Sequence, residues 1–111
     1  MNSMQNGIPD CYFSGDKGDL WAEMKYISTV PKRDTTLIYP DLSELQKKWL
    51  NNRYDEGRNT CVILGSPIGC YVFTDKTWTN GITRNHLVTP RLEVIEWILH
   101  QTKLNYKTCA E

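Results

Sequence analysis

Residues 7–28 constrain the fold more than any other stretch, because their pattern predicts a β-hairpin. A short apolar arm at residues 11–13 leads into a turn of Ser, Gly, Asp and Lys at residues 14–19. These residue types favour turns, since Gly accepts positive φ angles and Asp and Ser bond nearby backbone groups. The second arm, residues 20–27, alternates apolar and polar side chains over most of its length, as a strand with one buried face does. We therefore expect the chain to fold around an antiparallel pair of strands.

Three charged side chains gather on this hairpin. Glu23 and Lys25 are two residues apart on the second arm, so they share one face of the strand, whereas Met24 points to the other. Asp10 stands at the start of the first arm. Carboxylates that converge from neighbouring strands can hold a hard divalent cation through oxygen, and a nearby ammonium group can neutralise a phosphate oxygen. The pattern predicts a metal-assisted site made of Asp10, Glu23 and Lys25.

The same residues carry a resemblance to a known family. Pro9-Asp10, followed by Glu23-Met24-Lys25, resembles the PD-(D/E)xK signature of metal-dependent nucleases. Within that superfamily, the chain resembles the small VRR-NUC type, whose pattern is G-(V/I)-P-D, then E-x-K, then a helix reading S-x-x-Q-x-x-W-L. Here the first run is residues 7–10 and the helix pattern is residues 43–50. The resemblance covers residues 7–64, which is more than half of the chain.

This resemblance implies a fold, a chemistry and a substrate. The fold would be α/β (α+β), with a mixed central β-sheet flanked by helices in a restriction-endonuclease-like core. Asp10, Glu23 and the backbone carbonyl of Met24 would bind Mg²⁺ or Mn²⁺, and Lys25 would orient the attacking water. Gln46, on the first turn of the helix, would face the metal site. The activity would be hydrolysis of DNA, in a family that includes nucleases selective for branched or flapped DNA.

The start of the chain departs from the resembling family. Family members usually begin with a helix that packs on the sheet and can carry a further acidic residue, and residues 1–6 are too few to supply it. We therefore expect a core without that helix, in which another segment or another subunit covers the exposed face. This expectation favours a homodimer, whose second subunit is one source of a further carboxylate.

A helix is expected to begin after Ser43. Ser43 and Gln46 form an S-x-x-Q capping box, and Gly57 is a suitable stop. The apolar stripe expected to face the core consists of Leu42, Leu45, Trp49 and Leu50. Capping alone explains Gln46, and the resemblance adds a place for its amide beside the metal site. The two roles are compatible.

Further strands and a last helix complete the expected fold. The continuous apolar run at residues 60–64 predicts a buried strand, and residues 68–73 predict a strand that returns after a turn. The β-branched and aromatic residues 35–39 predict another short strand. Thr89 and Pro90 predict the start of the final helix. Its inward stripe is expected to contain Leu92, Ile95 and Leu99, widened by Val94, Trp97 and Ile98.

Several side chains outside these elements have both a structural and a functional interpretation. Lys32 and Arg33 lie on the polar loop beyond the hairpin, where they would contact a nucleic-acid phosphate or form a mobile flap; a solvated basic dipeptide is the alternative of equal weight. His86 has no carboxylate or Cys beside it and is expected to be solvated rather than catalytic. Trp78 is expected to be buried as a lid over the core.

The composition fits one soluble domain over residues 1–111. The chain has 13 Lys and Arg against 13 Asp and Glu, so any attraction to nucleic acid must come from a local basic patch. The four cysteines show no C-x-x-C pair and no His at zinc spacing, and are expected to be reduced thiols in the cytoplasm, the host's if the chain is phage-encoded. No apolar run approaches the length of a membrane span, and we expect no organic cofactor.

Two other functions remain compatible with these patterns. One is a nuclease fold that binds nucleic acid or a protein partner without cutting, which the neutral net charge favours. The other is a small interaction protein whose Asp10, Glu23 and Lys25 are separate, solvated side chains. The residues do not discriminate between DNA and RNA, between endonuclease and exonuclease action, or between one and two metal ions.

Overall fold

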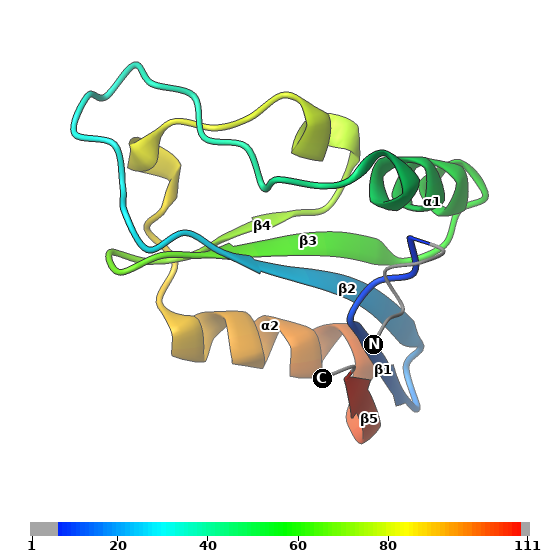
Figure 1. Cartoon of the computed structure of the whole chain (residues 1–111). Coiled ribbons are helices and arrows are strands. Elements are labelled where there is room, and N and C mark those ends of the chain that lie inside the picture. The colour runs from blue at the N-terminus through cyan, green and yellow to red at the C-terminus, as the bar shows by residue number, and fades with distance from the viewer. Residues whose placement is uncertain (1–6, 110–111) are drawn as a thin grey trace.

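The computed structural model describes the backbone of residues 7–109 and the side chains of residues 7–103. Its centre is a sheet of five described strands in the order β4-β3-β2-β1-β5 (Figure 1). The strands are β1 (Cys11–Gly15), β2 (Asp19–Tyr26), β3 (Thr60–Gly65), β4 (Tyr71–Phe73) and β5 (Leu104–Cys109). β2 and β3 run parallel, and the other neighbouring pairs run antiparallel. This confirms the expected α/β (α+β) class with a mixed central sheet.

Helices cover both faces of the sheet. α1 (Glu44–Asp55) and the loop of residues 27–43 lie on one face, with the short 3-10 helices η2 (Lys76–Thr79) and η3 (Arg84–His86). α2 (Arg91–Thr102) lies on the other face (Figure 1). The core therefore has two layers, one on each side of the strands. The α1 layer includes Leu50, Val62, Leu64, Phe73, Trp78 and Leu87, and the α2 layer includes Phe13, Leu20, Ala22, Ile63, Val94 and Ile98.

The expected hairpin is present and sets the register of the whole sheet. Phe13 of β1 pairs with Leu20 of β2, and both side chains are buried in the α2 layer. The next strand along the sheet, β3, is buried throughout residues 60–64, as its continuous apolar run predicts. A parallel pair needs a crossover connection, and α1 lies in the connection between β2 and β3. That crossover holds α1 against the sheet face that carries Glu23.

Of two further predicted strands, one is absent and the other is shorter than expected. Residues 35–39 form no strand, because Ile38 finds only an isolated bridge to Ile82 and no strand lies beside the rest of the run. Within residues 68–73, only Tyr71–Phe73 belongs to a strand. Cys70 instead pairs with Thr89, outside the sheet, after a turn at residues 66–69. In both segments the β-forming residues are present, but the available backbone partner is an isolated residue rather than a strand.

α1 begins and ends where the sequence predicts. Ser43 caps its first turn through a complete capping box with Gln46, and Gly57 follows its end at φ +82°. The inward stripe is partly wrong, because Leu45 is 51% exposed while the neighbouring Gln46 is 1% exposed. Burial of a polar side chain in place of an apolar one needs a hydrogen-bonded partner, which the candidate site supplies.

α2 has only part of its predicted inward surface in the core, because Val94 and Ile98 are buried as expected and the rest of the predicted stripe is not. Its buried side chains are Val94, Ile98 and Thr102, and the expected inward residues Leu92, Ile95 and Leu99 are 67%, 46% and 44% exposed. The helix starts one residue later than predicted, with Pro90 as its N-cap residue rather than its first helical residue. Two apolar stripes at helical spacing run along this helix, and the narrower one packs on the sheet.

Trp78 is a buried lid over the α1 layer, as predicted. Its side chain is 1% exposed, and its ring packs edge-on against Tyr54 with 6.1 Å between ring centroids. The indole Nε1–H donates to Asn51 Oδ1 at 2.9 Å, which satisfies its buried donor. The lid therefore joins η2 to α1.

The cysteines correct one expectation. Cys61 and Cys70 are free, and burial raises the pKa of the Cys61 thiol to about 12. Cys11, however, is disulfide-bonded, so the prediction of four reduced thiols is wrong for this residue. In the backbone register, Cys11 lies opposite Cys109 of β5. The two positions are far apart in the sequence, and only the pairing of β1 with β5 makes them neighbours.

α1 and α2 have 12 residues each, whereas a helix needs about 20 apolar residues to cross a bilayer. No helix of the described chain is long and apolar enough for such a span. The expected absence of an N-terminal helix falls on residues 1–6, which lie outside the described residues.

Candidate active site

β2 presents Glu23 and Lys25 to the α1 side of the sheet. Its alternate residues Leu20 and Ala22 are buried in the α2 layer, so the odd-numbered side chains face α1. Trp21 confirms this orientation, because its ring packs against Trp49 of α1 with 5.4 Å between centroids. The period of two in the sequence thus predicts the correct face for both charged residues.

Two hydrogen bonds from backbone N–H groups to side-chain carboxylates hold Asp10 close to Glu23 at the point where β1 begins. The Asp10 N–H donates to Glu23 Oε1 at 3.2 Å. In the other direction, the Met24 N–H donates to Asp10 Oδ2 at 3.3 Å. Each carboxylate is therefore held by the backbone of the segment that carries the other, and the two are kept close despite their like charge.

Gln46 connects this pair to helix α1. Its Nε2–H donates to Glu23 Oε2 at 3.0 Å, and its Oε1 accepts the Ser43 N–H at 2.9 Å. The Gln46 N–H in turn donates to Ser43 Oγ at 3.1 Å, which completes the capping box. One side chain thus caps the helix, as the sequence predicts, and also bonds the Glu23 carboxylate.

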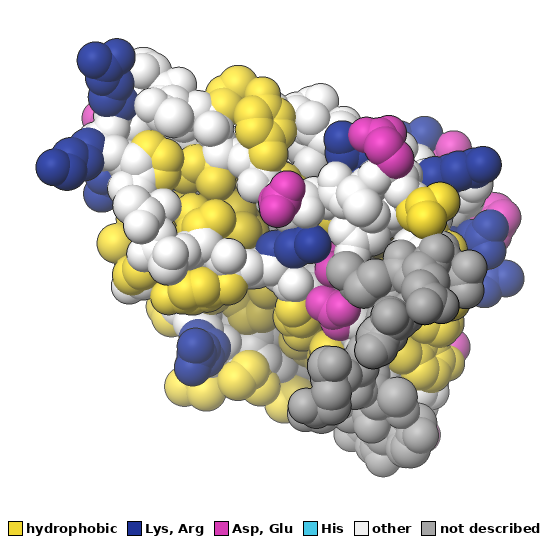
Figure 2. Space-filling view, viewed as in Figure 1, with side chains coloured by type: hydrophobic (Ala, Val, Ile, Leu, Met, Phe, Trp, Pro, Cys, Tyr) yellow, Lys and Arg dark blue, Asp and Glu magenta, His cyan; other side chains and the backbone are white. Residues whose placement is uncertain are grey.

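Lys25 completes the cluster. Its Nζ lies 3.6 Å from Glu23 Oε2, and its side chain is 21% exposed, against 1% for Glu23. The ammonium group is therefore between the buried carboxylate and solvent. Figure 2 shows basic and acidic side chains adjoining one another near the centre of this face of the molecule.

The electrostatics of the cluster are dominated by Glu23. Burial, and next the negative charge of Asp10, raise the pKa of Glu23 to about 7, although Lys25 acts in the opposite direction. The ionised carboxylate is therefore costly in the protein alone near neutral pH. A cation bound between the two carboxylates would relieve that cost.

Gly7 lets the segment that carries Asp10 pack closely against α1. It has φ +73°, and a Cβ at this position would lie 2.2 Å from the Leu45 carbonyl oxygen and 2.9 Å from the Gln46 backbone nitrogen. The chain before β1 therefore packs backbone to backbone on the first turn of α1. Gly7 is the first residue of the family pattern at residues 7–10, and its place three residues before Asp10 is the sequence signal for this contact.

The candidate metal ligands at this cluster include a backbone group. Within the part of the chain that the structure describes, no cluster of three or more His, Cys, Asp and Glu side chains could hold a metal ion. The set consists of two carboxylates and a backbone carbonyl. The N–H and C=O of a strand residue point to the same side, so the carbonyl of Met24 faces the side on which its N–H reaches Asp10. Carboxylate and carbonyl oxygens are hard donors, the type that Mg²⁺ and Mn²⁺ prefer in proteins.

Lys32 and Arg33 lie apart from this cluster. Both are exposed in the loop that follows β2, and neither forms an ion pair with a described residue. In Figure 2, Lys and Arg side chains gather over the outer end of that loop. Arg84 of η3 ties the loop down, since its Nη1 donates to the Pro31 carbonyl at 2.9 Å. The basic pair is thus solvated in the free chain, on a loop whose base is anchored.

His86 takes no part in the cluster. It is exposed in η3, where its Nδ1 lies 3.3 Å from Thr83 Oγ1 and its ring packs edge-on against Tyr71. The structure therefore brings Asp10, Glu23, Lys25 and Gln46 together, and leaves the loop residues and His86 outside. No family model, no curated protein and no solved structure matches this chain.

Proposed function

We propose that the chain is a metal-dependent nuclease that hydrolyses DNA phosphodiester bonds. The observation that carries the proposal is the environment of the buried Glu23 carboxylate. It accepts hydrogen bonds from Gln46 and the Asp10 backbone N–H and forms an ion pair with Lys25. A carboxylate that is buried near a second one is costly, so its retention favours a role in binding a cation. The convergence counts against a small interaction protein in which these residues would be solvated separately.

The roles follow from the contacts. Asp10, Glu23 and the Met24 carbonyl would hold Mg²⁺ or Mn²⁺. When bound there, the ion supplies Lewis-acid chemistry that activates water and neutralises charge on a phosphate. The Lys25 ammonium, at the solvent side of Glu23, would donate to the phosphate oxygen on which charge develops. Gln46 would hold the Glu23 carboxylate in one orientation.

Substrate binding requires more than this cluster. Exposed Lys32 and Arg33 are proposed to contact the phosphates of the DNA, at a distance from the cut that the anchored loop determines. A homodimer is proposed to supply the remaining surface, and the exposed Leu92 and Leu99 on α2 are its candidate contacts. The proposed compartment is the cytoplasm, and the disulfide-bonded Cys11 is the observation against it.

Cleavage of DNA tests the proposal directly. Linear, circular and four-way-junction DNA are incubated with the purified chain in Mg²⁺, in Mn²⁺ and in EDTA. We expect cleavage with metal and none in EDTA, and a loss of about a thousandfold or more in Asp10→Ala and Lys25→Ala. Asp10→Ala removes a ligand of the proposed cation, and Lys25→Ala removes the ammonium group that would donate to the reacting phosphate. Glu44→Ala is the control, because Glu44 is an exposed carboxylate that pairs only with Lys47 in the described structure.

Two results would reject the nuclease. One is cleavage that persists in Asp10→Ala, which would identify a contaminant. The other is binding of DNA without cleavage in either metal, which would establish the silent nucleic-acid-binding module. The neutral charge balance favours the module that binds without cutting. Both functions would use the same cluster of side chains, so the cleavage assay is what distinguishes them.

A further inference from the structure

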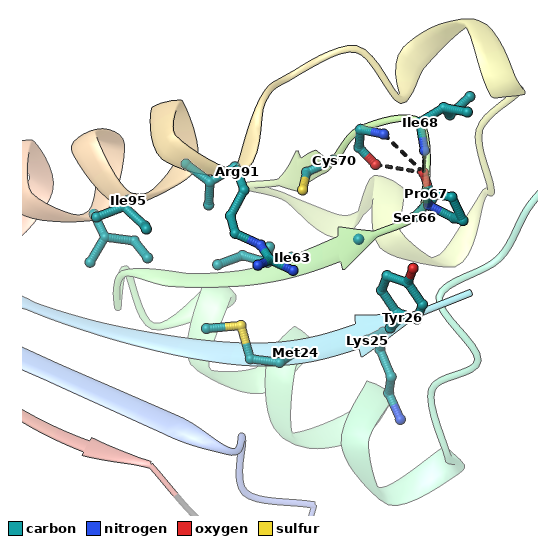
Figure 3. Close-up of a pocket in the computed structure, with 14 residues that line it drawn as sticks. Met24, Lys25, Tyr26, Ile63, Ser66, Pro67, Ile68, Cys70, Arg91 and Ile95 are labelled. Carbon is teal, nitrogen blue, oxygen red and sulfur yellow. Dashed lines mark hydrogen bonds between the residues drawn. The ribbon is translucent and has the colours of Figure 1, made fainter. Parts of the chain in front are cut away.

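A cleft lies on the face of the sheet opposite Glu23. It has a volume of about 740 Å³ and is bordered by β2, β3, the turn of residues 65–70 and the first turns of α2 (Figure 3). Small-molecule sites in proteins commonly have about 300–1,000 Å³. The cleft is therefore large enough for a small organic ligand, and the proposed nuclease chemistry makes no use of it.

The walls of the cleft are mainly apolar. They include the side chains of Met24, Ile63, Val94, Ile95 and Ile98. The rim turn brings little free polarity, because the Ser66 hydroxyl donates to the Gly69 carbonyl and accepts the N–H groups of Ile68 and Gly69 (Figure 3). A ligand that fills this space would have to be apolar over most of its surface.

One positive charge enters this apolar space. The charged residues that border the cleft are Lys25 and Arg91, and none of the described lining residues is Asp or Glu. Lys25 points from β2 to the opposite side, where its ammonium group meets Glu23, whereas Arg91 extends from α2 between the helix and β3 (Figure 3). Arg91 forms no ion pair with a described residue. Its guanidinium group is thus available to an anion.

The start of α2 adds to the same charge. Pro90 is the N-cap residue and provides no side-chain cap; its carbonyl accepts the Glu93 N–H at 3.0 Å, and the N–H groups of Arg91 and Leu92 receive no side-chain acceptor from the cap. The N-terminal end of a helix also favours negative charge. A guanidinium group fits the two oxygens of a carboxylate through parallel hydrogen bonds. The one charge of a guanidinium group matches the single charge of a carboxylate more closely than the double charge of a phosphate monoester.

We propose that this cleft binds a small monocarboxylic acid with an apolar body, its carboxylate on Arg91 and its body between α2 and β3. The chemistry is that of a medium-chain fatty acid or an aryl acid. This site is independent of the nuclease proposal, because it uses the other face of β2. It also differs from the candidate dimer contacts Leu92 and Leu99, which do not line the cleft.

Met24 provides a local reporter of binding. The chain has three methionines, of which Met24 borders the cleft. With ¹³C-labelled methionine methyl groups, the Met24 signal is assigned by its loss in Met24→Leu and followed by NMR during titration with decanoate. Decanol and decyl phosphate are the matched probes, with the same body and no charge or a second negative charge. Arg58→Gln is the control for Arg91→Gln, because Arg58 is exposed and pairs with Glu56 outside the cleft.

We expect decanoate to shift the Met24 signal, and both decanol and decyl phosphate to bind at least about tenfold more weakly, since a charge-assisted pair with Arg91 is lost or left uncompensated. Arg91→Gln should weaken decanoate binding by a similar factor and Arg58→Gln should not. Arg91→Lys keeps the positive charge but lacks the planar guanidinium group, so its affinity for decanoate should lie between those of the parent and Arg91→Gln. The proposal is overturned if decanol binds as tightly as decanoate or if Arg91→Gln binds decanoate unchanged. It also fails if Met24 responds to protein concentration and not to decanoate, which would mean that a second copy covers the cleft.

Discussion

Glu23→Gln is expected to abolish metal-dependent cleavage and, at the same time, to remove a pH dependence of stability from the metal-free chain. The pKa of Glu23 is raised from 4.5 to about 7 in the folded state. A raised folded-state pKa means that the protonated carboxyl stabilises the fold below the unfolded pKa, and that this stabilisation is lost as pH rises through about 7. The parent chain should therefore lose stability between pH 5 and pH 8 through this group.

The size of the effect follows from the shift. The parent's free energy of unfolding should fall by about 2 kcal/mol more than that of Glu23→Gln between pH 5 and pH 8. Urea denaturation of both proteins in EDTA, at the two pH values, measures this difference, because the other titrating groups are common to both. Equal pH slopes would contradict the burial and repulsion assigned to Glu23. Addition of Mg²⁺ at pH 8 should stabilise the parent and not the variant, by mass action on the folded state.

Gly7→Ala is expected to be the most destabilising single substitution near the site. A methyl group there would lie 2.2 Å from the Leu45 carbonyl oxygen, in a backbone conformation that side chains rarely adopt. Overpacking against backbone and a left-handed φ each cost about 1–3 kcal/mol, so we expect a loss of about 3–5 kcal/mol of unfolding free energy. If the segment instead lifts from α1, less stability is lost, but Asp10 leaves Glu23 and cleavage falls.

Gly57→Ala is the matched control for this prediction. Gly57 has φ +82°, close to the +73° of Gly7, but a Cβ there would meet nothing within 4 Å. It therefore carries the backbone strain without the clash, and should cost about 1 kcal/mol. Chemical denaturation and the cleavage assay are run on both variants. If Gly7→Ala is as stable as Gly57→Ala and still cleaves DNA, then close packing of the segment before β1 on α1 is needed neither for stability nor for cleavage.

The proximity of Glu23, Lys25 and Gln46 was predictable because the sequence signals for it are local. Glu23 and Lys25 share a face through the period of two, which does not depend on tertiary context. The Ser43 to Gln46 capping box is a four-residue pattern, and it places Gln46 where the crossover helix meets β2. Leu45 shows the limit of the same pattern. Apolar spacing alone favours its burial, yet the adjacent Gln46 is buried because Glu23 offers a hydrogen bond.

Features that depend on distant partners were not predictable. On α2, the stripe of Leu92, Ile95 and Leu99 and the stripe of Val94 and Ile98 both have helical spacing, and only the position of the sheet selects between them. Ile38 has suitable β propensity, but a strand needs a neighbouring strand and Ile82 supplies one bridge. Nothing in the spacing of the four cysteines indicates that Cys11 is disulfide-bonded, since the sheet order that sets its neighbours is a property of the whole fold.

The position of β5 beside β1 has a consequence for biosynthesis. Residues 104–109 form the outer neighbour of residues 11–15, so β1 leaves the ribosome well before the strand that covers its outer edge. The β1–β2 pair can close early, because its contacts are local, but its free edge must wait until β5 has been synthesised. During that interval the strand that positions Asp10 has an unpaired side open to other nascent chains. Slow translation over α2 would prolong this exposure, whereas slow translation before β2 would not.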